Sequence, residues 1–387
     1  MESSKIKGIK PFYVMDVLER AHAMEREGKN VIHLEVGEPD FDTPEPVKRA
    51  MERALADNKT HYTHSLGLVE LREAICAHYA ARYGVAVHPD QVLVANGTSP
   101  AMFMLFAALL EPGDEVVISD PGYACYANFV RFAGGEPALV RVFEEDGFQY
   151  RPEAIRARMN DRTRAILINS PANPTGTLLS EDRMRAVAGL GVPVVSDEIY
   201  HGLVYGEGAA AEHSILEFTD NAFVFNGFSK LYAMTGLRLG YLIAPRPYMR
   251  GFQKLAQNFF ISPNSVVQWA GIAALTECAD DVARMTAIYD ERRRFMIKRL
   301  KEIGLGIQVE PTGAFYVLAN ARHLCIATGK SSYDIAFDIL ESAHVGVTPG
   351  TDFGPGGDGY IRFSYANSLA NIAEGMDRLE RYVARVC

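Results

Sequence analysis

Short apolar runs, rich in β-branched residues, alternate with longer stretches of helical periodicity between about residue 45 and residue 290. These runs predict strands at residues 91–96, 115–120, 164–170, 192–197, 222–226 and 240–245. Because the runs are apolar throughout, each strand should be buried on both faces. The pattern therefore predicts an α/β fold in which a mostly parallel central sheet carries helices on both faces.

A charged stretch of helical character follows at residues 280–303, and the pattern beyond it mixes helix and strand. We interpret this helix as the connector to a smaller α+β domain. The expected organisation is an N-terminal arm that contributes to the small domain (1–40), a large domain (41–282) and a C-terminal small domain (283–387).

Polar residues stand where the predicted strands end, which is where parallel sheets bind ligands. After the first strand, Ser99 fits a helix N-cap and Pro100 the first helical position. Gly97, Thr98 and Ser99 would then offer N–H groups and hydroxyls to an anion, with a plain N-cap as the alternative. Asn173 lies in a turn between two prolines, and it fits either turn chemistry or a hydrogen bond to a ligand ring oxygen.

Three charged residues lie at or after the ends of the fourth and fifth predicted strands. Asp197 ends a buried run, where a carboxylate needs a cation or several donors; an N-cap or a structural ion pair is the alternative. Lys230 stands in an apolar stretch, and a lysine neutralised by burial is a nucleophile that can form a Schiff base. A structural lysine is the alternative. Arg238 offers a fork suited to phosphate, although a surface ion pair would explain it equally well.

The segment 360–368, "YIRFSYANS", alternates apolar and polar residues around Arg362 and predicts an edge or half-exposed strand. An arginine in such a strand can bind a carboxylate in bidentate fashion. The loop before it matches G-x-G-x-x-G at Gly354, Gly356 and Gly359. A dinucleotide fingerprint must open a helix, whereas this loop leads into a strand. The match therefore indicates loop geometry and disfavours a nicotinamide dehydrogenase.

The composition narrows the class of protein. A net charge of −9 in 387 residues argues against a nucleic-acid partner and favours a small molecule. The longest apolar run, at residues 101–110, is too short to span a bilayer, and the N-terminus lacks the apolar run of a secretory signal. Five widely spaced cysteines without a C-x-x-C pair favour a reducing compartment and neither disulfides nor a zinc site. We expect a soluble, cytoplasmic protein without a metal.

One cofactor would use a lysine, a carboxylate, an amide or phenol, and a phosphate cradle together, and that cofactor is pyridoxal 5′-phosphate. The chain resembles the class I/II aminotransferases of pyridoxal phosphate fold type I, from about residue 34 to residue 368. The resemblance rests on seven motifs in the family's order: "HYTHSLGLVELREAI", "NGTSPAMF", "DPGYACY", "NSPANPTG", "SDEIY", "SKLYAMTGLRLGY" and "IRFSYA".

The resemblance implies how the cofactor would be held. Lys230 would be the Schiff-base lysine and the catalytic base, and Asp197 would pair with the pyridine nitrogen. Asn173 and Tyr200 would bond the ring hydroxyl oxygen, Tyr200 counting among the catalytic residues. The phosphate would be bound by three residues of the same subunit and one of the neighbouring subunit: Thr98, Ser99, Arg238 and, across the interface, Tyr62.

The resemblance also implies the remaining parts of the site. Tyr123 would stack on the cofactor ring, and Arg362 would clamp the substrate's α-carboxylate beside Asn173 and the backbone of Gly37. The family's site lies at a subunit interface, so a homodimer is implied. The chain departs from many relatives at Gly227, where they carry a serine or threonine that binds the phosphate, so that contact is missing here.

The implied function is transfer of an amino group from an L-amino acid to a 2-oxo acid, by default 2-oxoglutarate, with ping-pong kinetics. A pyridoxal-phosphate-dependent C-S lyase or an aminocyclopropanecarboxylate synthase-like enzyme is the alternative, because these share the same motifs. A sensor domain of a transcription regulator is disfavoured, because only some forty residues precede "GEPDFDTP". The donor is not readable; Phe12, Tyr13 and the "HYTHS" loop are candidates to line its pocket, with simple packing of the arm as the alternative.

Overall fold

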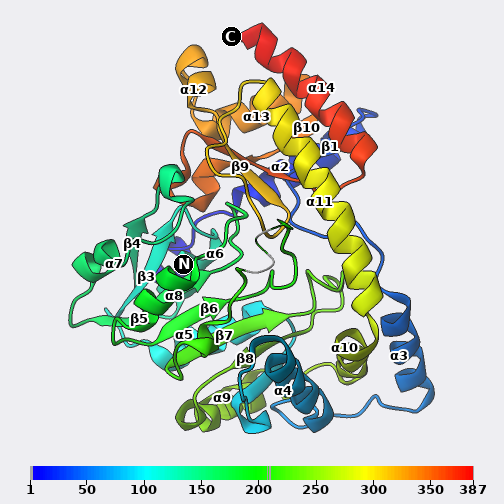
Figure 1. The fold of residues 1–387 in the computed structure, drawn as a ribbon, viewed down its shortest axis with the longest axis vertical. Coiled ribbons are helices and arrows are strands. Elements are labelled where there is room, and N and C mark those ends of the chain that lie inside the picture. Colours follow the sequence, from blue (N-terminus) through cyan, green and yellow to red (C-terminus); the bar gives the residue numbers. More distant parts are fainter. Residues whose placement is uncertain (1–2, 207, 209–210, 387) are drawn as a thin grey trace.

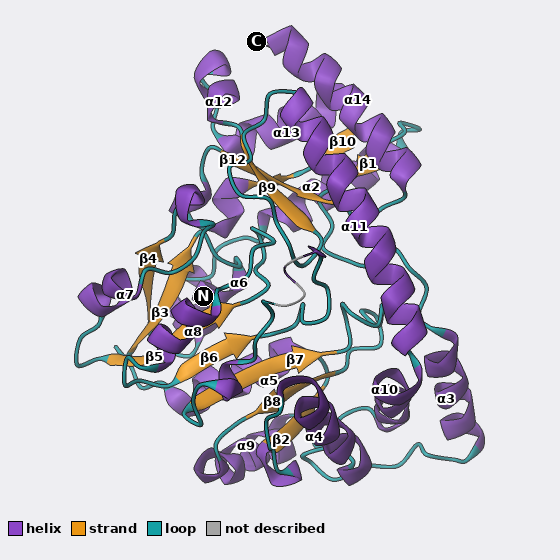
Figure 2. Ribbon diagram, viewed as in Figure 1, coloured by secondary structure: helices purple, strands orange, loops and turns teal. Residues whose placement is uncertain are grey.

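The computed structural model describes residues 3–206, 208 and 211–386. Its centre is a seven-stranded sheet with the strand order β2-β8-β7-β6-β5-β3-β4 (Figures 1 and 2). The strands are β2 (Val92–Ala95), β3 (Glu115–Asp120), β4 (Glu136–Arg141), β5 (Thr163–Asn169), β6 (Val194–Asp197), β7 (Ala222–Gly227) and β8 (Gly240–Ile243).

The sheet is mostly parallel, as the sequence predicts. Strands β4, β3, β5, β6 and β7 run parallel, whereas β8 is antiparallel to both of its neighbours, β7 and β2. All six predicted strands are present. Strand β4 escaped prediction because it is an edge strand that contains Pro137 and alternates buried with exposed positions, so it lacks a continuous apolar run.

Both faces of the sheet are buried because successive strand residues point to opposite sides. Val195 and Phe223 belong to one apolar core, and Val194 and Val224 to another. The first core is covered by α5 (Thr98–Leu109), α6 (Cys125–Phe132) and α9 (Arg246–Phe259). The second is covered by α3 (Glu45–Ala56), α4 (Val69–Tyr83), α7 (Pro152–Arg158), α8 (Glu181–Ala188) and α10 (Ser265–Glu277).

Two small sheets lie above the large one in Figure 1. One is antiparallel, with the order β11 (Thr348–Pro349), β12 (Tyr360–Ser364), β9 (Tyr316–Asn320); the other pairs β1 (Ile32–His33) with β10 (Val345–Gly346) in parallel. The helices beside these small sheets are α2 (Tyr13–Arg26), α11 (Ala279–Glu302), α12 (Arg322–Thr328), α13 (Ser332–Ala343) and α14 (Leu369–Val386). Helix α1 (Ser4–Lys7) packs instead against α6, where Lys5 Nζ lies 5.4 Å from the ring centre of Phe132. Helix α11 is the helix predicted at residues 280–303. We propose that both ends of the chain, 1–40 and 283–387, form the small domain.

Two predictions about local structure are wrong. Helix α5 begins at Thr98, so Ser99 is its second residue and not its N-cap. The cap is Gly97, whose φ of +96° favours glycine and where a side chain would meet the Arg238 guanidinium. The strand that carries Arg362 is neither an edge nor half-exposed, because β9 and β11 flank it and all five of its residues are buried.

The glycine-rich loop before β12 forms short 3₁₀ turns at Gly350–Phe353 and Pro355–Gly357 and leads into the strand, as predicted. Within the described residues, no helix is both long and apolar enough to cross a membrane.

Gly227 lies where β7 and β8 approach most closely, paired with Gly240. A Cβ atom on Gly227 would lie 2.9 Å from the Cα atom of Gly240 and 3.0 Å from the carbonyl oxygen of Leu239. This backbone therefore leaves no room for a serine or threonine side chain at this position.

We predict that Gly227→Ala lowers the free energy of unfolding by about 1–3 kcal/mol, because the added methyl group overpacks the strand pair. The matched control is Gly251→Ala in α9, where a Cβ meets nothing within 4 Å. That change should raise stability by about 0.5–1 kcal/mol, because alanine is the better helix former. Urea unfolding of both variants tests this, and equal effects would contradict the steric argument.

Candidate active site

A cavity of about 460 Å³ lies beyond the carboxyl ends of the parallel strands, between the large sheet and strands β9 and β12. It brings together ten of the eleven site residues named from the sequence. These are Gly37, Thr98, Ser99, Tyr123, Asn173, Asp197, Tyr200, Lys230, Arg238 and Arg362.

Tyr62 is the exception. It lies between α3 and α4, away from the cavity lining, and its side chain is 81% exposed. The role expected for it, contact with a phosphate in a neighbouring subunit, requires a second copy of the chain.

Lys230 follows β7 by three residues and reaches into the cavity. Its Nζ donates a hydrogen bond of 2.6 Å to the carbonyl oxygen of Gly37. Burial lowers the pKa of Lys230 to about 8; Glu38 opposes this shift and the Arg362 guanidinium adds to it. The amine therefore titrates close to neutral pH, where it can act as a nucleophile or as a base.

Asp197 ends β6 and points toward the same cavity. Its Oδ2 accepts a hydrogen bond of 2.7 Å from the Tyr126 hydroxyl, and its Oδ1 accepts one of 3.2 Å from the N–H of Ile199. Burial raises the pKa of Asp197 to about 6, against the effect of both hydrogen bonds. No described residue forms an ion pair with this carboxylate, so it is free to bind a cationic group in the cavity.

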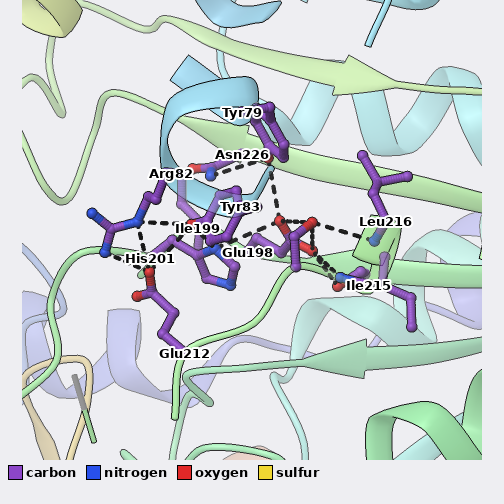
Figure 3. A network of polar contacts seen from close by, with 12 residues as sticks. Tyr79, Arg82, Tyr83, Glu198, Ile199, His201, Glu212, Ile215, Leu216 and Asn226 are labelled. Carbon is purple, nitrogen blue, oxygen red and sulfur yellow. Dashed lines mark hydrogen bonds and ion pairs between the residues drawn. The ribbon is translucent and has the colours of Figure 1, made fainter. Parts of the chain in front are cut away.

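Glu198, the residue after Asp197, lies at the centre of the polar network drawn in Figure 3. This buried carboxylate accepts hydrogen bonds of 3.0 Å from Ser196 Oγ, Ser214 Oγ and the N–H of Ile215, and one of 3.2 Å from the Tyr79 hydroxyl. These contacts fix the backbone next to Asp197.

The turn after Glu198 is held by a second part of the network in Figure 3. His201 Nδ1 lies 2.6 Å from the Tyr83 hydroxyl. Glu212 accepts from the N–H of Gly202 at 2.6 Å and from Arg82 Nε at 2.9 Å. This turn carries Tyr200 into the cavity.

Arg362 is 2% exposed and forms no ion pair with a described residue. Its Nη1 donates to Asn173 Oδ1 at 2.9 Å, and its Nη2 donates to Thr348 Oγ1 at 3.0 Å and to the carbonyl oxygen of Glu35. Its buried Nε has no hydrogen-bond partner among the described residues. The guanidinium stacks 4.4 Å from the ring centre of Tyr316. Such a buried cation, held only by neutral groups, suits a ligand carboxylate.

The opposite end of the cavity favours an anion. Helix α5 directs the N–H groups of Thr98 and Ser99 toward it, and a helix N-terminus carries partial positive charge. Gly240 permits this approach, because a Cβ there would lie 2.8 Å from the Thr98 nitrogen. Arg238 lines the same end and donates from Nη1 to the carbonyl oxygen of Thr235 at 3.0 Å.

The lining residues that the sequence analysis did not name include Tyr126, Asn169 and Tyr316. Tyr126 lies inside the motif "DPGYACY", and Asn169 ends β5, inside the strand predicted at residues 164–170, so the sequence contained a signal for both. The Nδ2 of Asn169 donates to the Asp197 carbonyl oxygen at 2.8 Å. Tyr316, whose hydroxyl lies 2.8 Å from that of Tyr200, carried no sequence signal. Of the candidates for the side-chain pocket, Phe12 lines the cavity, whereas Tyr13 and residues 61–65 do not.

A family model, curated sequences and solved structures all match this chain to aminotransferases. The family model "Aminotransferase class I and II" matches residues 29–379. The (5-formylfuran-3-yl)methyl phosphate transaminase of Methanocaldococcus jannaschii is 39% identical over 99% of this chain and 100% of that protein. An aspartate aminotransferase of Pyrococcus horikoshii is 39% identical over 96% and 95% of the two chains. A solved structure of Thermus thermophilus aspartate aminotransferase with maleate gives a TM-score of 0.93 at 36% identity, covering 98% and 99%.

We predict that modification of Lys230 by an amine-reactive reagent, followed by peptide mass spectrometry, has its midpoint near pH 8 in the ligand-free protein. In urea the midpoint should return to the ordinary lysine value of about 10.4. Between these two values the unfolded chain binds a proton that the folded chain lacks, so the contribution of Lys230 to stability rises with pH. Equal midpoints in both states would contradict the burial effect.

Proposed function

Since this chain belongs to the class I and II aminotransferase family, we propose that its cavity binds pyridoxal 5′-phosphate and moves an amino group from an L-amino acid to a 2-oxo acid. The chain is a transaminase with the α/β fold of its fold type I relatives. One observation carries the proposal: a lysine of lowered pKa, an unpaired buried carboxylate and an unpaired buried guanidinium surround one cavity.

The residues present fit this cofactor. Asp197 offers a carboxylate, without a cation among the described residues, to the protonated ring nitrogen. Asn173 and Tyr200 offer hydrogen bonds to the ring oxygen, and Tyr123 offers an aromatic face. The phosphate would lie at the positive end of the cavity, bound by Thr98, Ser99 and Arg238.

The cofactor, when bound, supplies a carbonyl carbon for the amine and a ring that accepts the electron pair left on the substrate Cα. Lys230 would hold the cofactor at rest, and its Nζ would then take the proton from the substrate Cα. The pKa of about 8 serves this step, because a base should titrate near the working pH. Gly37 contributes its carbonyl oxygen, 2.6 Å from Nζ, which orients the free amine.

Asp197 would keep the ring nitrogen of the bound cofactor protonated. An ion pair at about 4 Å and an effective dielectric near 20 contributes roughly 4 kcal/mol, or about three pKa units before desolvation is subtracted. Tyr126 holds the carboxylate in place. Because a protonated ring accepts the electron pair from Cα more readily, Asp197 would speed removal of the Cα proton without contacting the substrate.

Arg362 binds the α-carboxylate of the substrate. Asn173 Oδ1 and Thr348 Oγ1 fix the guanidinium plane, and the Tyr316 ring supports it from one side. This group recognises any α-amino acid and any 2-oxo acid, so one site serves both half-reactions.

Several finer points belong to the same proposal. Kinetics are ping-pong, with 2-oxoglutarate as the acceptor. The working form is a homodimer in which Tyr62 reaches the partner's phosphate, in keeping with its 81% exposure in the single chain. The enzyme works in the cytoplasm, which suits the four unpaired cysteines of the described chain: Cys76, Cys125, Cys278 and Cys325.

We predict that the purified holoenzyme shows the visible absorption band of protein-bound pyridoxal phosphate, and that certain L-amino acids bleach it without any 2-oxo acid present. One equivalent of 2-oxo acid should form, and the bleaching set identifies the donors. Sustained release of ammonia with no acceptor would instead indicate a lyase. A protein that gives no such band after incubation with the cofactor would overturn the proposal.

We predict that Asp197→Ala slows the half-reaction with a donor by about 10³-fold, the equivalent of the roughly 4 kcal/mol pair, while the cofactor stays bound. Tyr126→Phe removes one hydrogen bond to the same carboxylate and should slow it by only about tenfold. Stopped-flow absorbance measures both rates, and near-normal turnover of Asp197→Ala would refute the role of the carboxylate.

A further inference from the structure

A group of three side chains outside the cavity has the composition of a metal site. His22 and Glu25 lie three residues apart on α2, and His33 ends β1. One ligand atom from each residue lies within 4.8 Å of the others. The two histidine rings are 5.7 Å apart at 53°, and His33 Nε2 lies 3.1 Å from Glu25 Oε1.

Glu35 orients the His33 ring through the Nδ1 atom, which faces away from Glu25. Its carboxylate is fully buried, and Oε1 lies 2.7 Å from His33 Nδ1. Gly346 makes room for it, because a Cβ there would overlap the carboxylate. A carboxylate that accepts from one ring nitrogen directs the other nitrogen at a metal, and such outer partners are a regular feature of histidine-ligated sites.

We propose that His22, Glu25 and His33 form a binding site for a divalent transition metal of the zinc type, with Glu35 as the partner that orients His33. Two imidazoles and one carboxylate are a known zinc ligand set, with a fourth position left to water. Bonds of about 2.1 Å place tetrahedral ligand atoms about 3.4 Å apart, so atoms that lie within 4.8 Å of one another must approach by up to about 1.4 Å. His22 and Glu25 are exposed and can rotate to do so.

The site is connected to the substrate end of the cavity. The carbonyl oxygen of Glu35 accepts hydrogen bonds from Arg362 Nη2 and from Thr348 Oγ1, the latter at 3.1 Å. A metal that joins α2 to β1 would therefore also restrain the segment that supports Arg362. Because the site uses none of the cavity residues, it stands independently of the proposed transamination.

The cysteine spacing gave no reason to expect a metal, and the ligands here are separated by a helix end and a turn. The alternative to a metal site is a purely structural role, in which His33 only pairs with the carboxylates of Glu25 and Glu35. His22 distinguishes a metal site from this alternative, because the pairing of His33 with the two carboxylates does not need a second imidazole.

The test is zinc titration of the tag-free, chelator-treated holoenzyme by calorimetry, with thermal unfolding as a second readout. We expect one zinc per chain and a raised melting temperature. His22→Ala and Glu25→Gln, both at exposed positions that leave the fold intact, should weaken binding at least tenfold. Glu35→Gln should weaken it about 10- to 100-fold.

The matched control is His213→Ala. His213 also lies between two carboxylates, 3.0 Å from Glu217 and 3.8 Å from Glu181. Among the described residues, however, it does not belong to a group of three possible metal ligands. Its loss should leave zinc affinity unchanged. The proposal is overturned if zinc does not bind saturably, or if His22→Ala and Glu25→Gln bind it as tightly as the unchanged protein.

Discussion

Two buried charges without counterions determine the structure around the cavity. Asp197 and Arg362 are only 6% and 2% exposed, yet neither forms an ion pair with a described residue. Neutral groups hold them instead: a tyrosine hydroxyl and an N–H for the carboxylate, an amide, a hydroxyl and a carbonyl oxygen for the guanidinium. A buried charge held in this way keeps its capacity for an opposite charge. The fold therefore presents one negative and one positive group to the same cavity.

Each charge is supported by a different part of the chain. Glu198 and its partners fix the end of β6 that carries Asp197, so the large sheet supports the negative group. Arg362 depends on the carbonyl oxygen of Glu35, 327 positions earlier in the chain. That contact exists because β1 pairs with β10 and brings the two ends of the chain together. The distance between the two charges is thus set by how the small sheets rest on the large one.

The sequence predicted the elements whose signal is local. Continuous apolar runs identified six strands, and charge periodicity identified α11, because burial on both faces and helical spacing are read over a few residues. Strand β4 was missed, since an edge strand has only one apolar face. The start of α5 was misplaced by its serine, because the left-handed φ of Gly97, rather than a hydroxyl, determines where that helix begins.

The candidate site was predictable where a residue's chemistry is rare in its surroundings, as for Lys230 and Asp197. Tyr316 could not be found in this way, because a tyrosine in a buried strand is ordinary, and its role depends on Tyr200, 116 positions away. The same limit applied to Arg362, whose alternating neighbours indicated partial exposure. Its strand is buried between β9 and β11, and neutral groups of Glu35, Asn173 and the neighbouring Thr348 satisfy the guanidinium. The residues that carry charge can be named from sequence, whereas the neutral residues that make their burial possible emerge only from tertiary contacts.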